Sequence, residues 1–226
     1  PLFIPCDITD IPALQAAIAQ AAAAHGPITT LVNNAANDKR HSTTEVTEAF
    51  YTWMMDINFK HYFFATQAVV AGMKAAGGGS IINMSSVAGL KGSANLAAYN
   101  ATKGGVRIFT KGVALECAQS GWPIRVNSVH PGIIDTPIWT KLNPEFQKDG
   151  SHIIDTNALA RAAVPTGVLG TPLDIANGVK DTLNRLSGSF PEGLAYNITY
   201  DLSTFIESSM EELQVTLVQA FVLVIL

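Results

Sequence analysis

The stretch SVAGLKGSANLAAYNATK, from Ser86 to Lys103, decides how the rest of this chain is interpreted. It holds Tyr99 and Lys103 four residues apart, and Ser86 stands thirteen residues before the tyrosine. Residues 97–112 are rich in alanine, carry apolar residues at helical spacing and contain no proline, which predicts a helix. Because residues four apart lie on one face of a helix, Tyr99 and Lys103 are predicted to point into one pocket.

A lysine one helical turn from a tyrosine changes what the phenol can do. A free phenol has a pKa of about 10 and is a poor base near neutral pH. An ammonium about 4 Å away favours the phenolate by up to roughly 4 kcal/mol at an effective dielectric near 20. We therefore expect Lys103 to lower the pKa of Tyr99 by around three units, so that the phenol exchanges a proton with a substrate alcohol. Taken alone, the same spacing also fits a plain surface pair on an amphipathic helix.

Ser86 argues against the surface pair. Residues 80–86, SIINMSS, are interpreted as a buried strand that ends in two hydroxyls. Ser86 is then placed at the C-terminal end of a strand, where its hydroxyl donates a hydrogen bond to the oxygen that Tyr99 serves. The sequence thus predicts a serine, a tyrosine and a lysine in one catalytic group.

With these residues the chain resembles the short-chain dehydrogenase/reductase family, whose S-x12-Y-x3-K signature is met by Ser86, Tyr99 and Lys103. Four more motifs of that family follow in order over roughly residues 1–180. They are Asn33-Asn34-Ala35-Ala36, with alanine for the usual glycine; Asn58 in Asp56-Ile57-Asn58; the segment His130 to Thr136; and the late P-x-G-x-x-G-x-P-x-D-I-A pattern from Pro165 to Ala176. The resemblance implies an α/β fold with a Rossmann-like, doubly wound parallel sheet, and NAD or NADP as the cofactor.

The resemblance also implies the roles of single residues. Tyr99 would be the acid/base, and Lys103 would lower its pKa and bind the nicotinamide ribose. Asn58 would bend its helix and hold a relay water near the lysine; an interhelical hydrogen bond is the alternative, since asparagine is a poor helix former. Asp7 would contact the adenine, although it is equally well explained as a helix-entry residue. The further residues implied in cofactor binding are Ile8, Asn33, Ala35, Pro131, Gly132, Ile134 and Thr136.

The remaining elements are predicted from periodicity and from turn residues. Asp10 is expected to cap a helix over residues 11–24, and a second helix is expected over residues 47–72. Strands are predicted at residues 2–4, 28–33 and 123–129, and Gly77-Gly78-Gly79 is interpreted as a plain connection. Residues 138–159 are expected to cover the substrate. Candidate pocket residues there, for which a core or surface role is equally compatible, are Trp139, Phe146, His152 and Ile153.

Two regions depart from the family pattern. The family begins with a strand, a glycine-rich phosphate loop, a helix and a second strand, whereas this chain begins at what matches the third strand. The loop normally holds the pyrophosphate at a helix N-terminus. We therefore expect the isolated chain to bind dinucleotide weakly or not at all, and the strand at residues 28–33 to present an exposed edge.

The second departure lies at the other end. From about Asp181 the chain resembles a fragment of a resistance-nodulation-division efflux transporter. We expect two domains, an incomplete dehydrogenase domain over residues 1–180 and a foreign-looking tail over residues 181–226, with a strand at residues 194–200 and an apolar helix. Because a bilayer span needs about 20 apolar residues, the stretch LQVTLVQAFVLVIL does not suffice as written, and membrane contact of the tail is not favoured.

Composition restricts the partners. The 226 residues carry a net charge of −4 with a pI near 5.7, and the basic residues are scattered, which disfavours nucleic acid. Cys6 and Cys117 form no metal-ligand pattern and suggest free thiols in a reducing, cytoplasmic compartment. By family analogy we expect a small alcohol or ketone substrate and a homo-oligomer.

The leading hypothesis is therefore an NAD(P)-dependent oxidoreductase that moves a hydride between the nicotinamide and a secondary alcohol or its ketone. The alternative from another class is a catalytically impaired remnant, truncated or fused, that acts as a binding or assembly protein.

Overall fold

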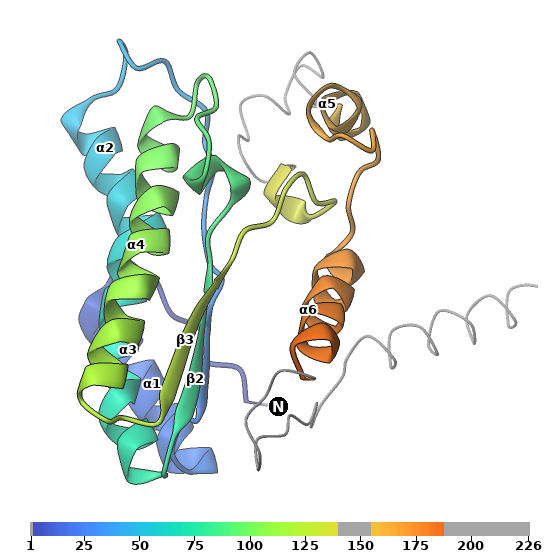
Figure 1. Ribbon diagram of the computed structural model, residues 1–226. Coiled ribbons are helices and arrows are strands. Elements are labelled where there is room, and N and C mark those ends of the chain that lie inside the picture. The colour runs from blue at the N-terminus through green and yellow to red at the C-terminus, as the bar shows by residue number, and fades with distance from the viewer. Residues whose placement is uncertain (1, 140–154, 188–226) are drawn as a thin grey trace, which may run out of the picture. The chain divides into compact units, whose positions relative to one another are not determined.

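A computed structural model describes residues 2–139 and 155–187 of the chain. The chain divides into two compact units, residues 1–169 and residues 170–226, and each is considered by itself. Figure 1 labels the elements named below. The predicted strand at residues 194–200, the apolar tail and the pocket candidates Phe146, His152 and Ile153 lie outside the described residues.

The first unit is built on a parallel sheet in the order β1-β2-β3. Its strands are β1 (Thr30–Asn33), β2 (Gly79–Met84) and β3 (Ile124–Val129). Leu31 pairs with Ile81, which pairs in turn with Val126, so three apolar side chains form one row across the sheet. Because the strands are parallel, their C-terminal ends, which precede Asn34, Ser85 and His130, lie along one edge.

Helices α1 (Ile11–His25), α3 (His61–Ala75) and α4 (Ala97–Gln119) pack on one face of this sheet (Figure 1). Asp10 caps α1, since its Oδ1 accepts a hydrogen bond from the Ala13 N–H at 3.0 Å, as predicted. The buried core between helices and sheet consists of Val69, Met73, Ile81, Cys117, Ile124 and Val126. Burial of this apolar layer stabilises the unit by about 25 cal/mol per Å² of apolar surface removed from water.

The region predicted as one helix over residues 47–72 is divided. Thr47 caps α2 (Glu48–Met55), a π-helix follows at Asp56–Lys60 (η1), and α3 then continues the same direction. A π-turn widens the helix by one residue and is frequent at functional sites. The turn falls at Asn58, so the local distortion expected at this residue is present.

Several predicted boundaries need correction. Residues 2–4, predicted as a strand, have no strand partner and run as irregular backbone. The helix with Tyr99 is longer than predicted and reaches Gln119, because Val106, Thr110 and Cys117 continue its buried stripe. Strand β1 starts at Thr30 and lies at the edge of the sheet, with the Val32 side chain 53% exposed, as expected for an open edge.

Shorter elements complete the described residues. They are two 3₁₀ turns, Val87–Gly89 (η2) and Pro137–Trp139 (η3), helix α5 (Thr156–Ala163) and, in the second unit, helix α6 (Pro172–Ser187). Thr171 and Asp174 cap α6 reciprocally: the Thr171 N–H and hydroxyl donate to the Asp174 carboxylate at 2.6 and 2.8 Å.

Candidate active site

Helix α4 brings Tyr99 and Lys103 together. Both side chains are buried, at 7% and 1% exposure, so they share the inward face of the helix as predicted and are not a surface pair. The Lys103 Nζ lies 5.7 Å from the centre of the Tyr99 ring. Gly89 makes this packing possible, because a Cβ there would lie 2.6 Å from the Lys103 carbonyl oxygen. Ser85 fixes the same carbonyl with a 2.8 Å hydrogen bond from its hydroxyl.

The ammonium of Lys103 is held by groups from two other elements. It donates to the Met84 carbonyl at the end of β2, at 2.8 Å, and to the Tyr62 hydroxyl of α3, at 3.2 Å. The Tyr62 hydroxyl itself donates to the Met84 carbonyl at 2.8 Å. Tyr62 was not predicted as a site residue, and sequence spacing gives no signal for it, since it stands 41 residues before its partner.

The expected pKa shift of Tyr99 is wrong in direction. Burial raises the pKa of the Tyr99 phenol above its usual value, and the negative charge of Asp38 raises it further, whereas a hydrogen bond with the Ser86 side chain lowers it. Burial also lowers the pKa of Lys103 to about 7. The expected lowering of the Tyr99 pKa assumes a permanently charged lysine beside a solvated phenol. In the folded chain both groups are desolvated, which favours their neutral forms.

Strand β2 ends at Met84, two residues before the predicted end at Ser86, and Ser86 joins the site to the next strand. Its hydroxyl interacts with Tyr99 and accepts the Ala88 N–H at 3.1 Å, which caps the short turn η2. Its carbonyl contacts the His130 Nδ1 at 3.2 Å, while the His130 Nε2 contacts the Ser128 hydroxyl at 2.9 Å. The Val87 N–H donates to the Pro131 carbonyl at 3.0 Å, and this hydrogen bond joins the segment after β2 to the segment after β3.

Asn58 is fully buried in the π-helix, and its side chain binds protein groups. The Oδ1 accepts the Asn37 N–H at 2.9 Å, and the Nδ2 donates to the Asn37 carbonyl at 2.9 Å and to the Met54 carbonyl at 3.1 Å. The alternative expected for this residue was an interhelical hydrogen bond; the structure instead shows bonds to the loop residue Asn37 and to Met54, one turn earlier.

The loop after β1, residues 37–41, contributes side chains near the site that were not predicted as site residues. Asp38 is 5% exposed, and the charges of Lys103 and Arg40 act on its carboxyl, whose pKa burial raises to about 6. The His41 Nε2 accepts the Ala98 N–H at 3.0 Å in the first turn of α4. The neighbouring His61 donates from Nε2 to the Ala35 carbonyl at 3.0 Å, and burial lowers its pKa to about 4.

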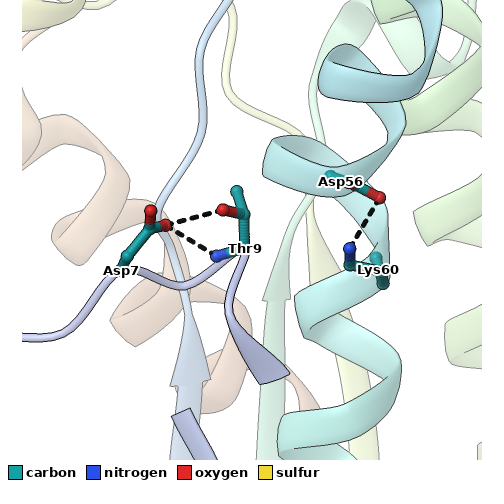
Figure 2. Close-up of polar contacts among 4 residues, drawn as sticks. All are labelled: Asp7, Thr9, Asp56 and Lys60. Atoms are coloured by element: carbon teal, nitrogen blue, oxygen red, sulfur yellow. Dashed lines mark hydrogen bonds and ion pairs between the residues drawn. The ribbon is translucent and has the colours of Figure 1, made fainter. Parts of the chain in front are cut away.

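The residues implied in binding the adenine end have mainly local contacts. The Asp7 Oδ1 accepts the Thr9 N–H at 2.9 Å and the Thr9 hydroxyl at 2.8 Å, and these bonds lower the pKa of the exposed carboxyl (Figure 2). Ile8 is half-buried. The Asn33 side chain is turned into the sheet, where its Nδ2 donates to the Asn83 Oδ1 at 2.9 Å, which leaves only its backbone for a ligand.

The segment after β3 holds the other implied residues. Gly132 is exposed, and the Pro131 carbonyl is taken by Val87. The Ile134 carbonyl accepts the indole N–H of Trp139 and a longer hydrogen bond from the Thr136 hydroxyl at 3.5 Å. The indole of Trp139 therefore braces this segment.

A hollow of about 550 Å³ lies elsewhere in the first unit, against α2. It is lined by Thr9, Glu48, Ala49, Thr52, Trp53 and Asp56. Figure 2 shows the ion pair at its edge, in which the Lys60 Nζ lies 2.9 Å from the Asp56 carboxylate. The three residues of the catalytic signature do not line it.

The sequence profile of the short chain dehydrogenases matches residues 1–147. The chain belongs to the short chain dehydrogenase family. Its curated relatives include the NADP-dependent (R)-specific alcohol dehydrogenase of Lentilactobacillus kefiri, 41% identical over 68% of this chain and 58% of the relative. They also include the 2,5-dichloro-2,5-cyclohexadiene-1,4-diol dehydrogenase LinX of Sphingobium indicum, 37% identical over 78% of this chain and 66% of the relative. This short chain dehydrogenase thus spans about three fifths to two thirds of the length of these relatives.

Solved structures support the same family and the same fold. The structure of ElxO with bound NADP superposes with a TM-score of 0.68 at 30% identity, covering 80% of this chain and 69% of that one. The predicted family and the Rossmann-like parallel α/β fold are thereby confirmed. A second profile, that of the AcrB/AcrD/AcrF family, matches residues 170–226, in agreement with the predicted resemblance of the tail to an efflux transporter.

The residues around Tyr99 fit the nicotinamide end of an NAD(P) cofactor. An ammonium has three N–H donors. Lys103 uses two of them, for the Met84 carbonyl and the Tyr62 hydroxyl, which leaves one for a ribose hydroxyl. This donor set lies at the C-terminal edge of a parallel sheet, where open α/β sheets bind their ligands.

In the part of the chain that the structure describes, no helix is both long and apolar enough to cross a bilayer.

Proposed function

We propose that this chain carries the catalytic centre of an NAD(P)-dependent oxidoreductase that interconverts a secondary alcohol and its ketone. The observation that carries the proposal is the buried Tyr99 phenol, whose pKa the Ser86 side chain lowers, one helical turn before the buried Lys103. The relatives named for oxidising an alcohol and a diol support the reaction class. One relative is NADP-dependent, and ElxO has NADP bound; both observations support NAD(P) as the cofactor.

Each residue has one task in the proposed reaction. NAD or NADP, when bound, supplies or takes the hydride. Ser86 holds the substrate oxygen by a hydrogen bond, and Tyr99 gives that oxygen a proton or takes one from it. Because burial raises the pKa of Tyr99, the phenol keeps its proton at neutral pH and is suited to act as the acid when a ketone is reduced. Lys103 offers its third N–H to the nicotinamide ribose.

The remaining implied contacts belong to the same proposal. The backbones of Asn33 and Ala35, together with Asp7 and Ile8, would serve the adenosine half of the cofactor. The segment that holds Pro131, Gly132, Ile134 and Thr136 would serve the nicotinamide carboxamide and the phosphates. Asn58 would hold the relay water through its backbone, since its side chain is used by Asn37.

Replacement of Tyr99 by phenylalanine tests the assignment. Secondary alcohols and ketones would be assayed with both NAD(H) and NADP(H). We expect Tyr99→Phe to lower kcat by about 10²- to 10⁴-fold, the usual contribution of a general acid or base. Tyr51→Phe is the matched control, because Tyr51 is 50% exposed on α2 and lies outside the site. A Tyr99→Phe chain as active as the Tyr51→Phe chain would contradict the proposal.

Cofactor binding separates the enzyme from the non-catalytic alternative. A titration of NADH and NADPH, followed by nicotinamide fluorescence, measures affinity without turnover. If Lys103 contacts the cofactor as proposed, wild type binds NADH or NADPH, and the affinity of Lys103→Met for the nucleotide is weaker. A chain that binds neither nucleotide at millimolar concentration would favour the binding or assembly role.

We extend the proposal to a homo-oligomer built on α3 and α4. Three large apolar side chains on these helices are exposed: Phe63 at 48%, Ile108 at 63% and Leu115 at 62%. The Phe63 and Phe109 rings lie 5.6 Å apart, so the aromatic surface continues from one helix to the other. Light scattering on wild type and Ile108→Glu would test this, and a monomeric wild type would exclude it.

We also propose a reducing, cytoplasmic location for the first domain. Cys6 and Cys117 are both free thiols, and disulfides are rare in that compartment. The proposed domain boundary near residue 181 lies within α6, whereas the two compact units divide between residues 169 and 170. A fluorescent fusion of the full chain, compared with one ending at residue 180, would show whether the tail redirects the protein to a membrane.

A further inference from the structure

The carboxyl of Asp38 is buried, and one of its two oxygens has no hydrogen-bond partner among the described residues. The residue is 5% exposed, which is as buried as Tyr99 at 7%, and its Oδ1 accepts no hydrogen bond from the described residues. A buried acceptor without a donor loses its hydration and gains nothing in exchange. Such groups are rare in folded proteins and each calls for a specific explanation.

The loop that carries Asp38 is fixed at both ends. Before it, both backbone groups of Asn37 are bonded to the Asn58 side chain in the π-helix. After it, the His41 N–H donates to the Asn95 carbonyl at 2.9 Å, and the His41 imidazole accepts the Ala98 N–H. Asp38 therefore lies between two anchored neighbours, in a bridge from the π-helix to the first turn of α4.

The second anchor ends beside the reacting group. Ala98, which His41 holds, immediately precedes Tyr99 in α4. The charge of Asp38 acts on both the Tyr99 phenol and the Lys103 ammonium, so the carboxyl shares the neighbourhood of the catalytic pair. Arg40, the other cation that acts on Asp38, is exposed and makes no ion pair with it among the described residues.

We infer that Asp38 is a specificity residue whose free carboxylate oxygen accepts a hydrogen bond from a second hydroxyl of the substrate. The site would then take vicinal diols, hydroxy ketones and sugars in preference to simple alcohols. The reacting oxygen lies between Ser86 and Tyr99, and the hydroxyl on the neighbouring carbon reaches Asp38. A site built to bond a hydroxyl rejects the analogue that lacks it, because its own polar group is then left unpaired. This inference rests on the proposed oxidoreductase function.

The test compares cyclohexane-1,2-diol with cyclohexanol, and butane-2,3-diol with butan-2-ol, for the full chain with NAD(P). The variants are Asp38→Ala and Asp38→Asn, the latter of nearly unchanged volume. Lys39→Ala is the control, because Lys39 is exposed in the same loop. We expect the ratio of kcat/KM for diol to that for mono-alcohol to fall by about 10- to 100-fold in Asp38→Ala, the range for a hydrogen bond to a charged group. A smaller fall is expected in Asp38→Asn and none in Lys39→Ala.

Two results would overturn the inference while the oxidoreductase function stands. One is an equal loss on diol and mono-alcohol, which would show that Asp38 acts only through the charge of Lys103. The other is an unchanged ratio, which would leave water as the partner of the carboxyl.

If wild type oxidises no alcohol, the proposed function has failed, and direct binding decides the inference alone. Saturation-transfer NMR with cyclohexane-1,2-diol should then show binding that weakens at least 10-fold in Asp38→Ala and is unchanged in Lys39→Ala. Equal binding to both variants, or no binding to wild type, would reject the inference.

Discussion

Tyr99 and Asp7 are predicted to touch the same cofactor, yet they lie in contrasting surroundings. Tyr99 and its partner Lys103 are buried; groups from β2 and α3 hold Lys103, and His41 of the loop after β1 holds the Ala98 N–H next to Tyr99. Asp7 is exposed, and its carboxylate bonds only to Thr9, two residues further on. One end of the proposed site is thus fixed by tertiary contacts and the other by a local turn.

The difference teaches which residues are coupled to folding. A group in a buried network affects stability, because its partners are desolvated with it and lose their only bonds when it is removed. A group in an exposed turn exchanges its partners for water at little cost. Substitutions at the two ends should therefore differ in their effect on unfolding, and the following predictions are ordered by the size of that effect.

Asn58→Leu should have the largest effect. It removes the partner of both backbone groups of Asn37 and so releases the loop that carries Asp38. Two half-buried backbone groups left unpaired, each costing up to about 1–3 kcal/mol, give an expected loss of about 3 kcal/mol in the free energy of unfolding. Urea titrations would measure it, with Asn127→Leu as the control on the exposed side of β3. Equal midpoints for the two variants would show that the loop is not anchored by Asn58.

Lys103→Met should change how stability depends on pH. The pKa of Lys103 is about 7 in the folded chain and has its ordinary value of 10.5 in the unfolded chain. Between these values the unfolded chain binds more protons, so the stability of wild type rises as pH rises, by about 2 kcal/mol from pH 7 to pH 9. The variant keeps the Met84 carbonyl paired with Tyr62 and should lack this rise.

Urea titrations of wild type and Lys103→Met at the two pH values would measure the difference. Lys111→Met, on an exposed position of the same helix, is the control and should keep the wild-type slope. A wild type whose stability is flat over this range would mean that Lys103 is solvated in the folded chain, which contradicts the contrast with Asp7.

Asp7→Asn should have the smallest effect. The two hydrogen bonds from Thr9 lower the pKa of the Asp7 carboxyl, so its contribution is present above the ordinary pKa and is lost as pH falls through the folded value. Because the group is fully exposed, we expect the unfolding midpoints of wild type and variant to agree closely at pH 7 and to coincide at pH 3. A much lower unfolding midpoint for the variant at pH 7 would mean that Asp7 has tertiary partners, which contradicts the proposed difference between Asp7 and Tyr99.

The parts of the fold that follow local rules were predictable. Asp10 caps α1 because a carboxylate at that position satisfies a free N–H of the first turn, and the sequence shows both. Tyr99 and Lys103 share a helix face because 3.6 residues make one turn. The strand predicted at residues 2–4 is not formed. A strand needs hydrogen bonds from a neighbouring strand, and an apolar run in the sequence does not show whether such a strand is present.

The identities of several site residues were predictable from the sequence, whereas their tertiary contacts were not. Ser86, Tyr99, Lys103 and Asn58 were found from spacing and family resemblance. Tyr62 and Asp38 were missed, because nothing in their own neighbourhood distinguishes a buried site residue from an ordinary aromatic or an exposed charge. What reveals them is the contact with Lys103 in one case and the absence of a donor in the other.

The amino-acid sequence by itself determined the family of this chain, the alternation of strands and helices between residues 11 and 129, and the placing of a phenol and an amine one helical turn apart. Only the tertiary structure decided that both groups are desolvated, which reverses the expected pKa shift of Tyr99, and that the ammonium of Lys103 binds Met84 and Tyr62. The physical reason is that helix geometry depends on neighbours along the chain, whereas solvation depends on everything that packs around a group in space.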